Sequence, residues 1–188
     1  MTEANRGHGL QPLVETTGGE LIISWHQYHG LIEHLAWQLH QGGCRFDQIV
    51  ALSRGGLRVG DVLSRIFDKP LVVMAAQSYS GSNGREQGEL RLGNQLAHTC
   101  ESLGPDLLLV DDLADSGATL LAAQQWLEQN FTACKIHKAV LWLKGCSRIK
   151  PDVWAMELPA NPWIVQPFEQ WQEKQPAELR PLRKNILN

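Results

Sequence analysis

Residues 107–121 read Leu-Leu-Leu-Val-Asp-Asp-Leu-Ala-Asp-Ser-Gly-Ala-Thr-Leu-Leu, and this stretch decides the fold class. Residues 107–110 form a short, wholly apolar run, which is typical of a strand buried on both faces of a parallel sheet. Asp111 and Asp112 follow where such a strand is expected to end, and the small residues 116–119 lead into a predicted helix. The sequence therefore predicts an α/β fold with carboxylates at the carboxyl end of a strand, beside a helix N-terminus.

Open α/β sheets bind ligands outside the carboxyl ends of their strands. A helix N-terminus offers free N–H groups to a phosphate, and Gly117 lets the backbone approach an anion closely. Adjacent carboxylates can bind a divalent cation or accept hydrogen bonds from a diol. A ligand with a ribose, a phosphate and a bound magnesium ion would suit both the helix N-terminus and the pair of carboxylates. The alternative is an acidic turn with a capping residue, although three aspartates within 111–115 would repel one another without a cation or donors.

The stretch from Val110 to Thr119 resembles the phosphoribosyl-pyrophosphate (PRPP) signature of type I phosphoribosyltransferases. In that signature apolar residues, two acids and two further residues precede Asp-Thr/Ser-Gly-Gly/Ala-Thr. The resemblance implies the fold of that family, a Rossmann-like parallel sheet flanked by helices, with a small hood over the base site. It also implies an enzyme, a pentosyltransferase, that uses PRPP together with Mg²⁺.

The resemblance also implies roles for the residues of this stretch. Asp111 and Asp112 would hold the ribose hydroxyls, and Asp112 would contact the metal. Asp115 would face N7 of a purine and manage its proton. The 5′-phosphate would be cradled by the loop that opens the helix, which consists of Asp115, Ser116, Gly117, Ala118 and Thr119.

A second strand–loop–helix unit comes earlier in the chain. Residues 48–52 predict a buried strand, and Ser-Arg-Gly-Gly-Leu at 53–57 follows at its carboxyl end. The alternatives are a second anion site, with Arg54 as a charged fork, and a Gly-rich turn with an exposed Arg. The pentapeptide resembles the pyrophosphate loop of purine phosphoribosyltransferases, most of all those of the bacterial xanthine-guanine type. The likeness implies that Arg54, Gly55 and Gly56 bind PRPP, and that the peptide bond after Arg54 can be cis.

Residues 77–93 are polar, Gly-rich and long, and loops of this kind are usually functional or mobile. The family has a mobile hood over the reacting centre here, and Ser78-Tyr79 followed by Arg85-Glu86 resembles its Ser-Tyr…Arg-Glu pattern. The implied role of Arg85 is to reach over the pyrophosphate when the loop closes. Arg91 is a weaker second candidate. For either arginine taken alone, an exposed surface position is the default interpretation.

The base pocket is predicted in the C-terminal third of the chain. Residues 135–143 predict a strand with Lys144 at its carboxyl end, and 163–169 read Trp-Ile-Val-Gln-Pro-Phe-Glu. A Trp between turn residues is by itself explained by packing. The family likeness implies instead that Trp163 stacks on the purine, that Ile164 contacts the base edge through its backbone, and that Lys144 donates to the 6-oxo group. No role is assigned to the acid that ends the motif.

The likeness covers about Leu21 to Glu169, with a few departures. Ala118 stands where Gly is common, Gly145 follows the lysine where a Pro is usual, and Phe-Glu replaces Trp-Asp at the end of the last motif. The last two departures fall in the predicted base pocket, so the preferred base stays open.

Bulk composition bounds the remaining possibilities. The 188 residues, 43% of them hydrophobic, suit one globular domain, with 1–19 as a flexible extension, 144–170 as hood and base pocket, and 171–188 as a tail. A net charge of −3 and the lack of a basic run do not favour a nucleic-acid partner. Four cysteines without Cys-x-x-Cys spacing, no signal peptide and no apolar span of membrane length predict a cytoplasmic protein with reduced thiols.

The resulting hypothesis is a purine-salvage transferase that moves the phosphoribosyl group of PRPP to guanine, xanthine or hypoxanthine and releases pyrophosphate. The likeness further implies a homo-oligomer, a dimer or a tetramer. The alternatives are a PRPP-binding regulator without turnover, a phosphoribosyltransferase for orotate, uracil or adenine, and a purely structural α/β domain. The last alternative leaves the acid cluster unexplained.

Overall fold

A computed structural model describes residues 16–17, 19–78, 90–131, 135–159, 161–172 and 174–179. The chain divides into two compact units. The larger is His29–Asn161, and the smaller joins the described residues up to Tyr28 with those from Pro162 onward. In the described part of the chain, no helix is long and apolar enough to cross a membrane.

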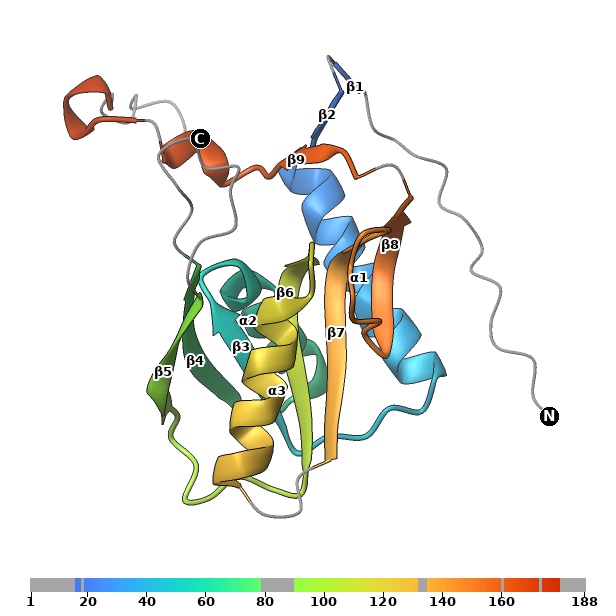
Figure 1. Cartoon of the computed structure of the whole chain (residues 1–188), viewed down its shortest axis with the longest axis vertical. Coiled ribbons are helices and arrows are strands. Elements are labelled where there is room, and N and C mark those ends of the chain that lie inside the picture. Colours follow the sequence, from blue (N-terminus) through green and yellow to red (C-terminus); the bar gives the residue numbers. More distant parts are fainter. Residues whose placement is uncertain are drawn as a thin grey trace, which may run out of the picture. The chain divides into compact units, whose positions relative to one another are not determined.

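The larger unit is built on a six-stranded sheet with the strand order β5-β4-β3-β6-β7-β8 (Figure 1). The neighbours from β4 to β8 in that order pair in parallel, and β5 pairs antiparallel with β4 at one edge. This mostly parallel sheet confirms the predicted fold class. The strands are β3 (Gln48–Ser53), β4 (Leu71–Ser78), β5 (Leu90–Ala97), β6 (Asp106–Ala114), β7 (Lys135–Lys144) and β8 (Val153–Leu158).

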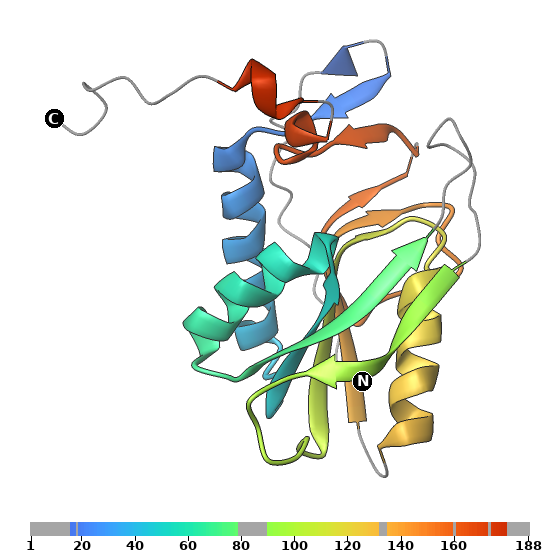
Figure 2. The same cartoon turned by 90° about the vertical axis from the view of Figure 1, so that its left-hand side faces the viewer.

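Helices cover both faces of this sheet. α2 (Gly55–Phe67) connects β3 to β4, and α3 (Ala118–Asn130) connects β6 to β7 on the opposite face (Figure 2). The part of α1 (Trp25–Gln41) that belongs to this unit lies on the same face as α2. Since the neighbours β3 and β6 send their helices to opposite faces, their carboxyl ends form the topological switch point, where such sheets bind ligands.

The core explains why the central strands read as unbroken apolar runs. The interiors of β3 and β6 are buried on both faces, from Ile49 to Leu52 and from Leu107 to Val110. Val59 and Leu63 of α2 are buried on one side of the sheet, and Leu120, Ala123 and Leu127 of α3 are buried on the other. Burial of one such side chain contributes roughly 1.5–3 kcal/mol, so these strands anchor the unit and fix the ends that carry the acids.

Both ends of α1 follow from local sequence. The backbone N–H of Gln27 donates to Oγ of Ser24 at 3.2 Å, and the backbone N–H of Ser24 donates to Oε1 of Gln27 at 2.8 Å. This reciprocal pair is a capping box. The helix ends at Gln41, and Gly43, two residues later, adopts a φ of 63°.

The smaller unit contains a three-stranded sheet in the order β1-β2-β9. Its strands are β1 (Thr16–Thr17), β2 (Glu20–Ile22) and β9 (Trp163–Val165), and β2 pairs in parallel with β9. Two short 3₁₀ helices follow, η1 (Glu169–Trp171) and η2 (Pro176–Glu178). Aromatic rings pack within the unit: Tyr28 meets Phe168 edge-on at a centroid distance of 5.7 Å, and Trp25 lies 5.6 Å from Trp171.

The structure corrects several predicted boundaries. β6 does not end before the acids but runs through them to Ala114, because Asp111, Leu113 and Ala114 still pair with β7. β5 and β9 were not predicted, and β1 lies inside the supposed extension 1–19. The 3₁₀ helix η1 ends at the first residue of the predicted tail and η2 lies within it, and the assignment of 171–188 as a tail stays a prediction.

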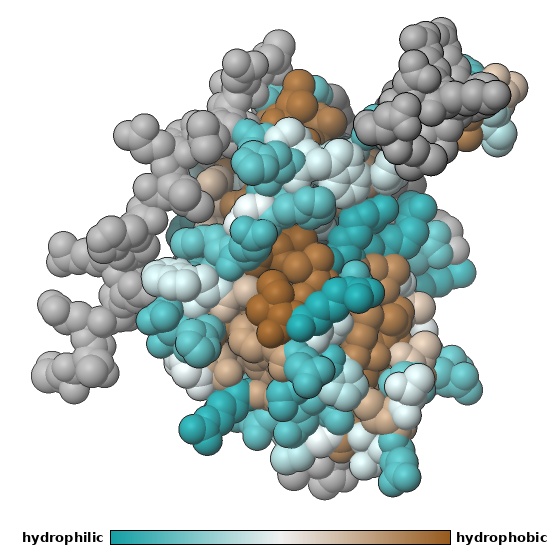
Figure 3. All heavy atoms as spheres, turned by 180° about the vertical axis from the view of Figure 1, so that it is seen from behind, coloured by the Kyte–Doolittle hydropathy of each residue, from teal (hydrophilic) through white to brown (hydrophobic). Residues whose placement is uncertain are grey.

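One face of the molecule carries exposed apolar surface among polar side chains (Figure 3). Trp37 of α1 and Ile66 of α2 are about half exposed, at 52% and 50%. Trp37 stacks on His34 with a centroid distance of 5.8 Å, and burial lowers the pKa of that histidine. The described residues contain no metal-ligating cluster of three or more His, Cys, Asp or Glu.

Candidate active site

The two predicted anion loops meet at the switch point. Gly55 and Gly56 begin α2, and a Cβ atom on Gly55 would run into the carboxylate of Asp112. A Cβ atom on Gly56 would lie 2.5 Å from the carbonyl oxygen of Val110 and 3.0 Å from Cα of Asp111. Only glycine lets the start of α2 come this close to the acid pair. The structure thus brings together four residues that the sequence singled out separately.

Burial disfavours the ionised forms of both Asp111 and Asp112. Burial and the neighbouring charge of Asp112 raise the pKa of Asp111 well above its usual range. Backbone N–H groups of Asp112 and Gly56 oppose this rise, the first at 2.9 Å from Oδ1 of Asp111. Burial also raises the pKa of Asp112, against hydrogen bonds and the charge of Arg58. A divalent cation bound to both carboxyl groups would stabilise their ionised forms, so the pair is a suitable set of metal ligands.

We expect Asp111→Asn to raise the thermal stability of the metal-free protein near pH 7. The pKa of Asp111 is higher in the folded state, so the folded state binds more protons and stability falls as pH rises through that pKa. The gain should therefore shrink as pH is lowered toward about 4, the ordinary carboxyl range. Thermal unfolding in a chelator at both pH values measures it. Asp61→Asn, at an exposed ion pair with Arg65, is the control, and an equal effect of Asp111→Asn at both pH values would contradict the account.

Arg54 is exposed at the N-cap position of α2. The cis peptide bond among the described residues joins Ser53 to Arg54, so the position expected after Arg54 is wrong by one bond. Arg58 was not singled out from the sequence, yet its charge acts on Asp112. Arg58 comes four residues after Arg54, so the two lie on the same side of the first helical turn. This spacing could have identified Arg58 from the sequence.

The loop before α3, which the sequence predicts to cradle a phosphate, is fixed by hydrogen bonds and close packing. Gly117 is the N-cap residue with a φ of 78°, a conformation that favours glycine. The backbone N–H of Ala118 donates to Oγ of Ser116 at 3.3 Å. The backbone N–H of Arg148 donates to the carbonyl oxygen of Ser116 at 3.0 Å, and a Cβ atom on Gly117 would lie 2.8 Å from Oγ of Ser147. Residues 147–149 therefore pack against this loop and hold it in place. The sequence did not indicate this contact.

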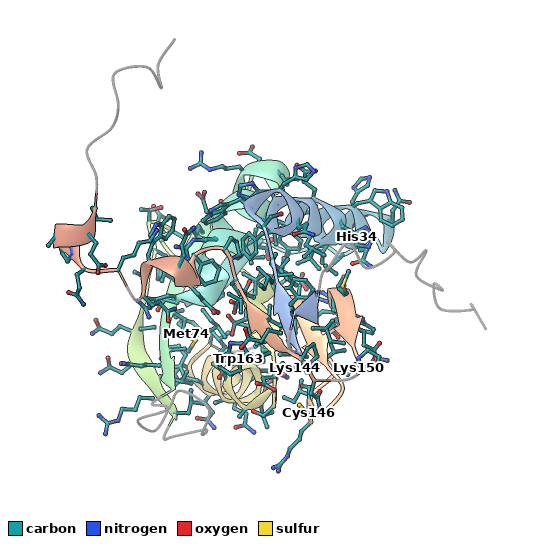
Figure 4. The ribbon with its side chains drawn as sticks, turned by 90° about the horizontal axis from the view of Figure 1, so that it is seen from above. His34, Met74, Lys144, Cys146, Lys150 and Trp163 are labelled. Atoms are coloured by element: carbon teal, nitrogen blue, oxygen red, sulfur yellow. The ribbon has the colours of Figure 1, made fainter. Side chains whose placement is uncertain are left out.

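Asp115 and Lys144, predicted separately as base contacts, form an ion pair. Nζ of Lys144 lies 3.1 Å from Oδ2 of Asp115, and the lysine side chain is 8% exposed whereas the aspartate is 54% exposed. Sγ of Cys146 lies 3.3 Å from Oδ1 of the same carboxylate. Figure 4 shows Lys144 and Cys146 close together at the end of β7. The acid is held from one side and open to solvent on the other.

Three other predicted site residues, Trp163, Ile164 and Arg91, belong to other elements of the chain. Trp163 and Ile164 belong to β9 in the smaller unit, where Trp163 is 42% exposed and Ile164 is buried against β2. Arg85 lies outside the described residues. Arg91 lies in β5, next to the described end of that segment, and is exposed.

A cavity of about 520 Å³ lies at the opposite edge of the larger unit, at the amino ends of β6, β7 and β8. Its lining includes Gln38, Cys44, Arg45, Lys135 and His137. None of the predicted site residues lines it. The carboxyl edge of the sheet remains the candidate site because acids, helix N-termini and a buried lysine converge there.

Comparison with known proteins gives a family match over most of the chain. Residues 24–172 match the family described as phosphoribosyl transferase domain. A xanthine-guanine phosphoribosyltransferase from Nitratidesulfovibrio vulgaris is 28% identical over 148 residues, which span 78% of this chain and 83% of that protein.

Solved structures show the same fold. A purine phosphoribosyltransferase from Pyrococcus horikoshii matches with a TM-score of 0.65 and 25% identity, covering 88% of this chain and 99% of its own. The Helicobacter pylori xanthine-guanine-hypoxanthine phosphoribosyltransferase matches with a TM-score of 0.66 and 24% identity, covering 80% of this chain and 94% of its own. At such identity the second likeness speaks for the fold alone.

Proposed function

The chain belongs to the phosphoribosyl transferase domain family, and from this premise we propose that it transfers the phosphoribosyl group of PRPP to a 6-oxopurine base, guanine, xanthine or hypoxanthine. Pyrophosphate is the second product, and the role is that of a glycosyltransferase in purine salvage. The observation that carries the proposal is the packing of Gly55 and Gly56 against Asp111 and Asp112, next to the Asp115–Lys144 ion pair. One rim thus offers groups for sugar, phosphates and base.

PRPP is held by three sets of groups in this proposal. Asp111 and Asp112 accept hydrogen bonds from the ribose hydroxyls. The pyrophosphate lies against the N-terminus of α2, near Arg54, the Gly55 and Gly56 amides and Arg85, and Arg58 adds a positive charge that acts on Asp112. The 5′-phosphate lies at the N-terminus of α3, in the loop of Asp115, Ser116, Gly117, Ala118 and Thr119.

Mg²⁺ fits the acid pair, with Asp112 as the preferred contact. The described residues contain no larger cluster of ligating side chains, and magnesium commonly binds through one or two carboxylates plus substrate oxygens. When bound, the ion neutralises charge on the pyrophosphate and so stabilises it as a leaving group. The protein's own part is to present two carboxylates that repel each other when empty.

The base is proposed to bind over Asp115 and Lys144. Nζ of Lys144 carries three N–H donors, of which Oδ2 of Asp115 takes one, so donors remain for the 6-oxo group of a purine. The exposed side of Asp115 accepts the proton at N7 as the base nitrogen bonds to C1 and the C1–O bond to pyrophosphate breaks. Trp163 stacks on the base, for roughly 1–3 kcal/mol, and the Ile164 backbone contacts its edge.

No protein nucleophile is required, because breaking the C1–O bond leaves an oxocarbenium-like ribose that the base captures. The protein contributes position and charge stabilisation. Closure of the loop that contains Arg85 would exclude water and limit hydrolysis of PRPP.

Further features of the protein are proposed on the same premise. We expect one phosphoribosyltransferase domain over 1–188, with 144–170 as hood and base pocket, and a dimer or tetramer in solution. A cytoplasmic location is proposed from the thiols, since Cys44, Cys100 and Cys146 are free in the described part of the chain.

A panel of bases tests the proposed function. Guanine, xanthine, hypoxanthine, adenine, uracil and orotate are each incubated with PRPP and Mg²⁺, and nucleotide formation is followed by absorbance. We expect turnover with at least one 6-oxopurine and little with the other three, because Lys144 offers donors that suit a 6-oxo group and not the 6-amino group of adenine. Turnover with orotate, uracil or adenine alone would contradict the proposed 6-oxopurine substrate. Tight PRPP binding without turnover of any base would instead indicate a PRPP-binding regulator.

A further inference from the structure

Both oxygens of the Asp115 carboxylate have a donor from one short segment. Nζ of Lys144 lies 3.1 Å from Oδ2, and Sγ of Cys146 lies 3.3 Å from Oδ1 and 3.6 Å from the Asp115 carbonyl oxygen. The carboxylate is 54% exposed, so solvent does not confine its rotation. A carboxylate held at one oxygen can turn about its Cβ–Cγ bond, whereas one held at both oxygens keeps its plane.

The segment that carries these donors is itself fixed. The backbone N–H of Gly145 donates to the carbonyl oxygen of Leu158 at 3.0 Å, and that of Cys146 donates to Oδ1 of Asn161 at 3.2 Å. A Cβ atom on Gly145 would lie 2.9 Å from the carbonyl oxygen of Pro159. A proline at 145 could not make the first bond. Gly145 therefore lets the chain turn so that the Cys146 thiol reaches Asp115.

Building on the proposed transfer, we propose that Cys146 is a positioning residue, whose S–H group holds Asp115 in the orientation that accepts the purine proton. Lys144 can then share its donors with the base while the thiol keeps the carboxylate aligned. Burial, the hydrogen bond to Asp115 and its charge raise the pKa of the thiol, so it stays protonated and able to donate near neutral pH.

Kinetics of two substitutions test this role. Cys146→Ala should lower kcat about tenfold, the loss expected when a hydrogen bond to a charged group is removed. The KM for PRPP should stay within about twofold, because the thiol bonds to oxygen atoms of Asp115 whereas the 5′-phosphate is held mainly by backbone N–H groups of the loop. Cys146→Ser keeps a donor and should recover most of kcat. Cys100→Ala, at a thiol remote from this carboxylate, is the matched control and should leave kcat unchanged.

Thiol chemistry provides a readout that needs no turnover. In the full-length Asp115→Asn variant, loss of the carboxylate charge should make Cys146 react with iodoacetamide roughly threefold faster or more, since thiolate is the reacting form. Peptide mass spectrometry gives the rate at each cysteine, and Cys44, whose neighbouring charges are Asp152, Lys135 and Asp106, should not change.

The outcomes separate this inference from the proposed function. Wild-type protein that turns over purines while Cys146→Ala is equally active, or while Cys146→Ser is as impaired as Cys146→Ala, overturns the positioning role and leaves the transferase intact. An unchanged alkylation rate in Asp115→Asn also overturns it. If Cys146 is alkylated faster in Asp115→Asn but the wild-type protein transfers phosphoribose to no base, the contact between Cys146 and Asp115 is supported. The proposed transfer and the positioning role that rests on it are then both overturned.

Discussion

Asp115→Asn should lower kcat by about 10²–10⁴-fold while the KM for PRPP stays within about threefold. Asparagine keeps the size of the side chain and an oxygen that can still accept from Nζ of Lys144 at the observed 3.1 Å separation. It cannot take a proton from the base. Because the 5′-phosphate is held mainly by backbone N–H groups of the loop, PRPP binding should survive the change.

Steady-state kinetics with the best base of the panel measure this effect, with PRPP varied at saturating base. Asp61→Asn, which removes a carboxylate from an exposed pair with Arg65, is the matched control and should keep wild-type kcat. A thermal melt of each variant checks that it is folded. Wild-type turnover in Asp115→Asn would remove this residue from the chemistry.

Gly55→Ala should weaken magnesium-dependent PRPP binding by about tenfold to hundredfold. The new Cβ atom would run into the Asp112 carboxylate, so the acid or the start of α2 must shift. Overpacking of this kind typically costs about 1–3 kcal/mol, and here the group that must move is the proposed metal contact. Isothermal calorimetry with PRPP and Mg²⁺ measures the affinity directly.

Gly30→Ala is the matched control for this substitution. Gly30 lies in α1, and a Cβ atom there would have no atom within 4 Å. Alanine should stabilise the helix by about 0.5–1 kcal/mol and leave PRPP affinity unchanged. Equal affinities of Gly55→Ala and Gly30→Ala would show that the contact between α2 and Asp112 does not shape the site.

The buried parallel strands and the helices could be predicted because their signals are local. Apolar runs such as Leu107–Val110 appear in the sequence wherever a strand is covered on both faces, and α1 carries its own capping residues. The family resemblance read from Val110–Thr119 and Ser53–Leu57 is confirmed by the match over residues 24–172. The fold class followed from these stretches alone.

Elements stabilised by distant partners could not be predicted. Three of the eight residues of β5 are polar and Gly93 lies inside it, and the strand forms because it pairs with β4 at an edge of the sheet. β9 has three residues and depends on pairing with β2, more than a hundred positions away in the sequence. β6 extends beyond its apolar residues because its last residues still pair with β7 through backbone hydrogen bonds. No window of sequence contains these partners.

The candidate site divides in the same way. The residues of its loops were found from the sequence, since small residues and acids after buried strands are visible there. The contacts between these residues were not found from the sequence. No sequence pattern indicates the hydrogen bond from the Cys146 thiol to Asp115, or the one from the Arg148 backbone N–H to the Ser116 carbonyl oxygen. Spacing across a sheet is set by register, so residues 29 or more positions apart become neighbours only in the folded chain.

Calorimetric titration of the wild-type protein with PRPP tests the central claim most directly, namely that the acids and the two helix N-termini form one binding site for a sugar diphosphate with its cation. We predict saturable binding of one PRPP per chain in the presence of Mg²⁺, and a large loss of affinity when the metal is removed by a chelator. Absence of binding heat with Mg²⁺ present, in protein shown to be folded, would contradict the account.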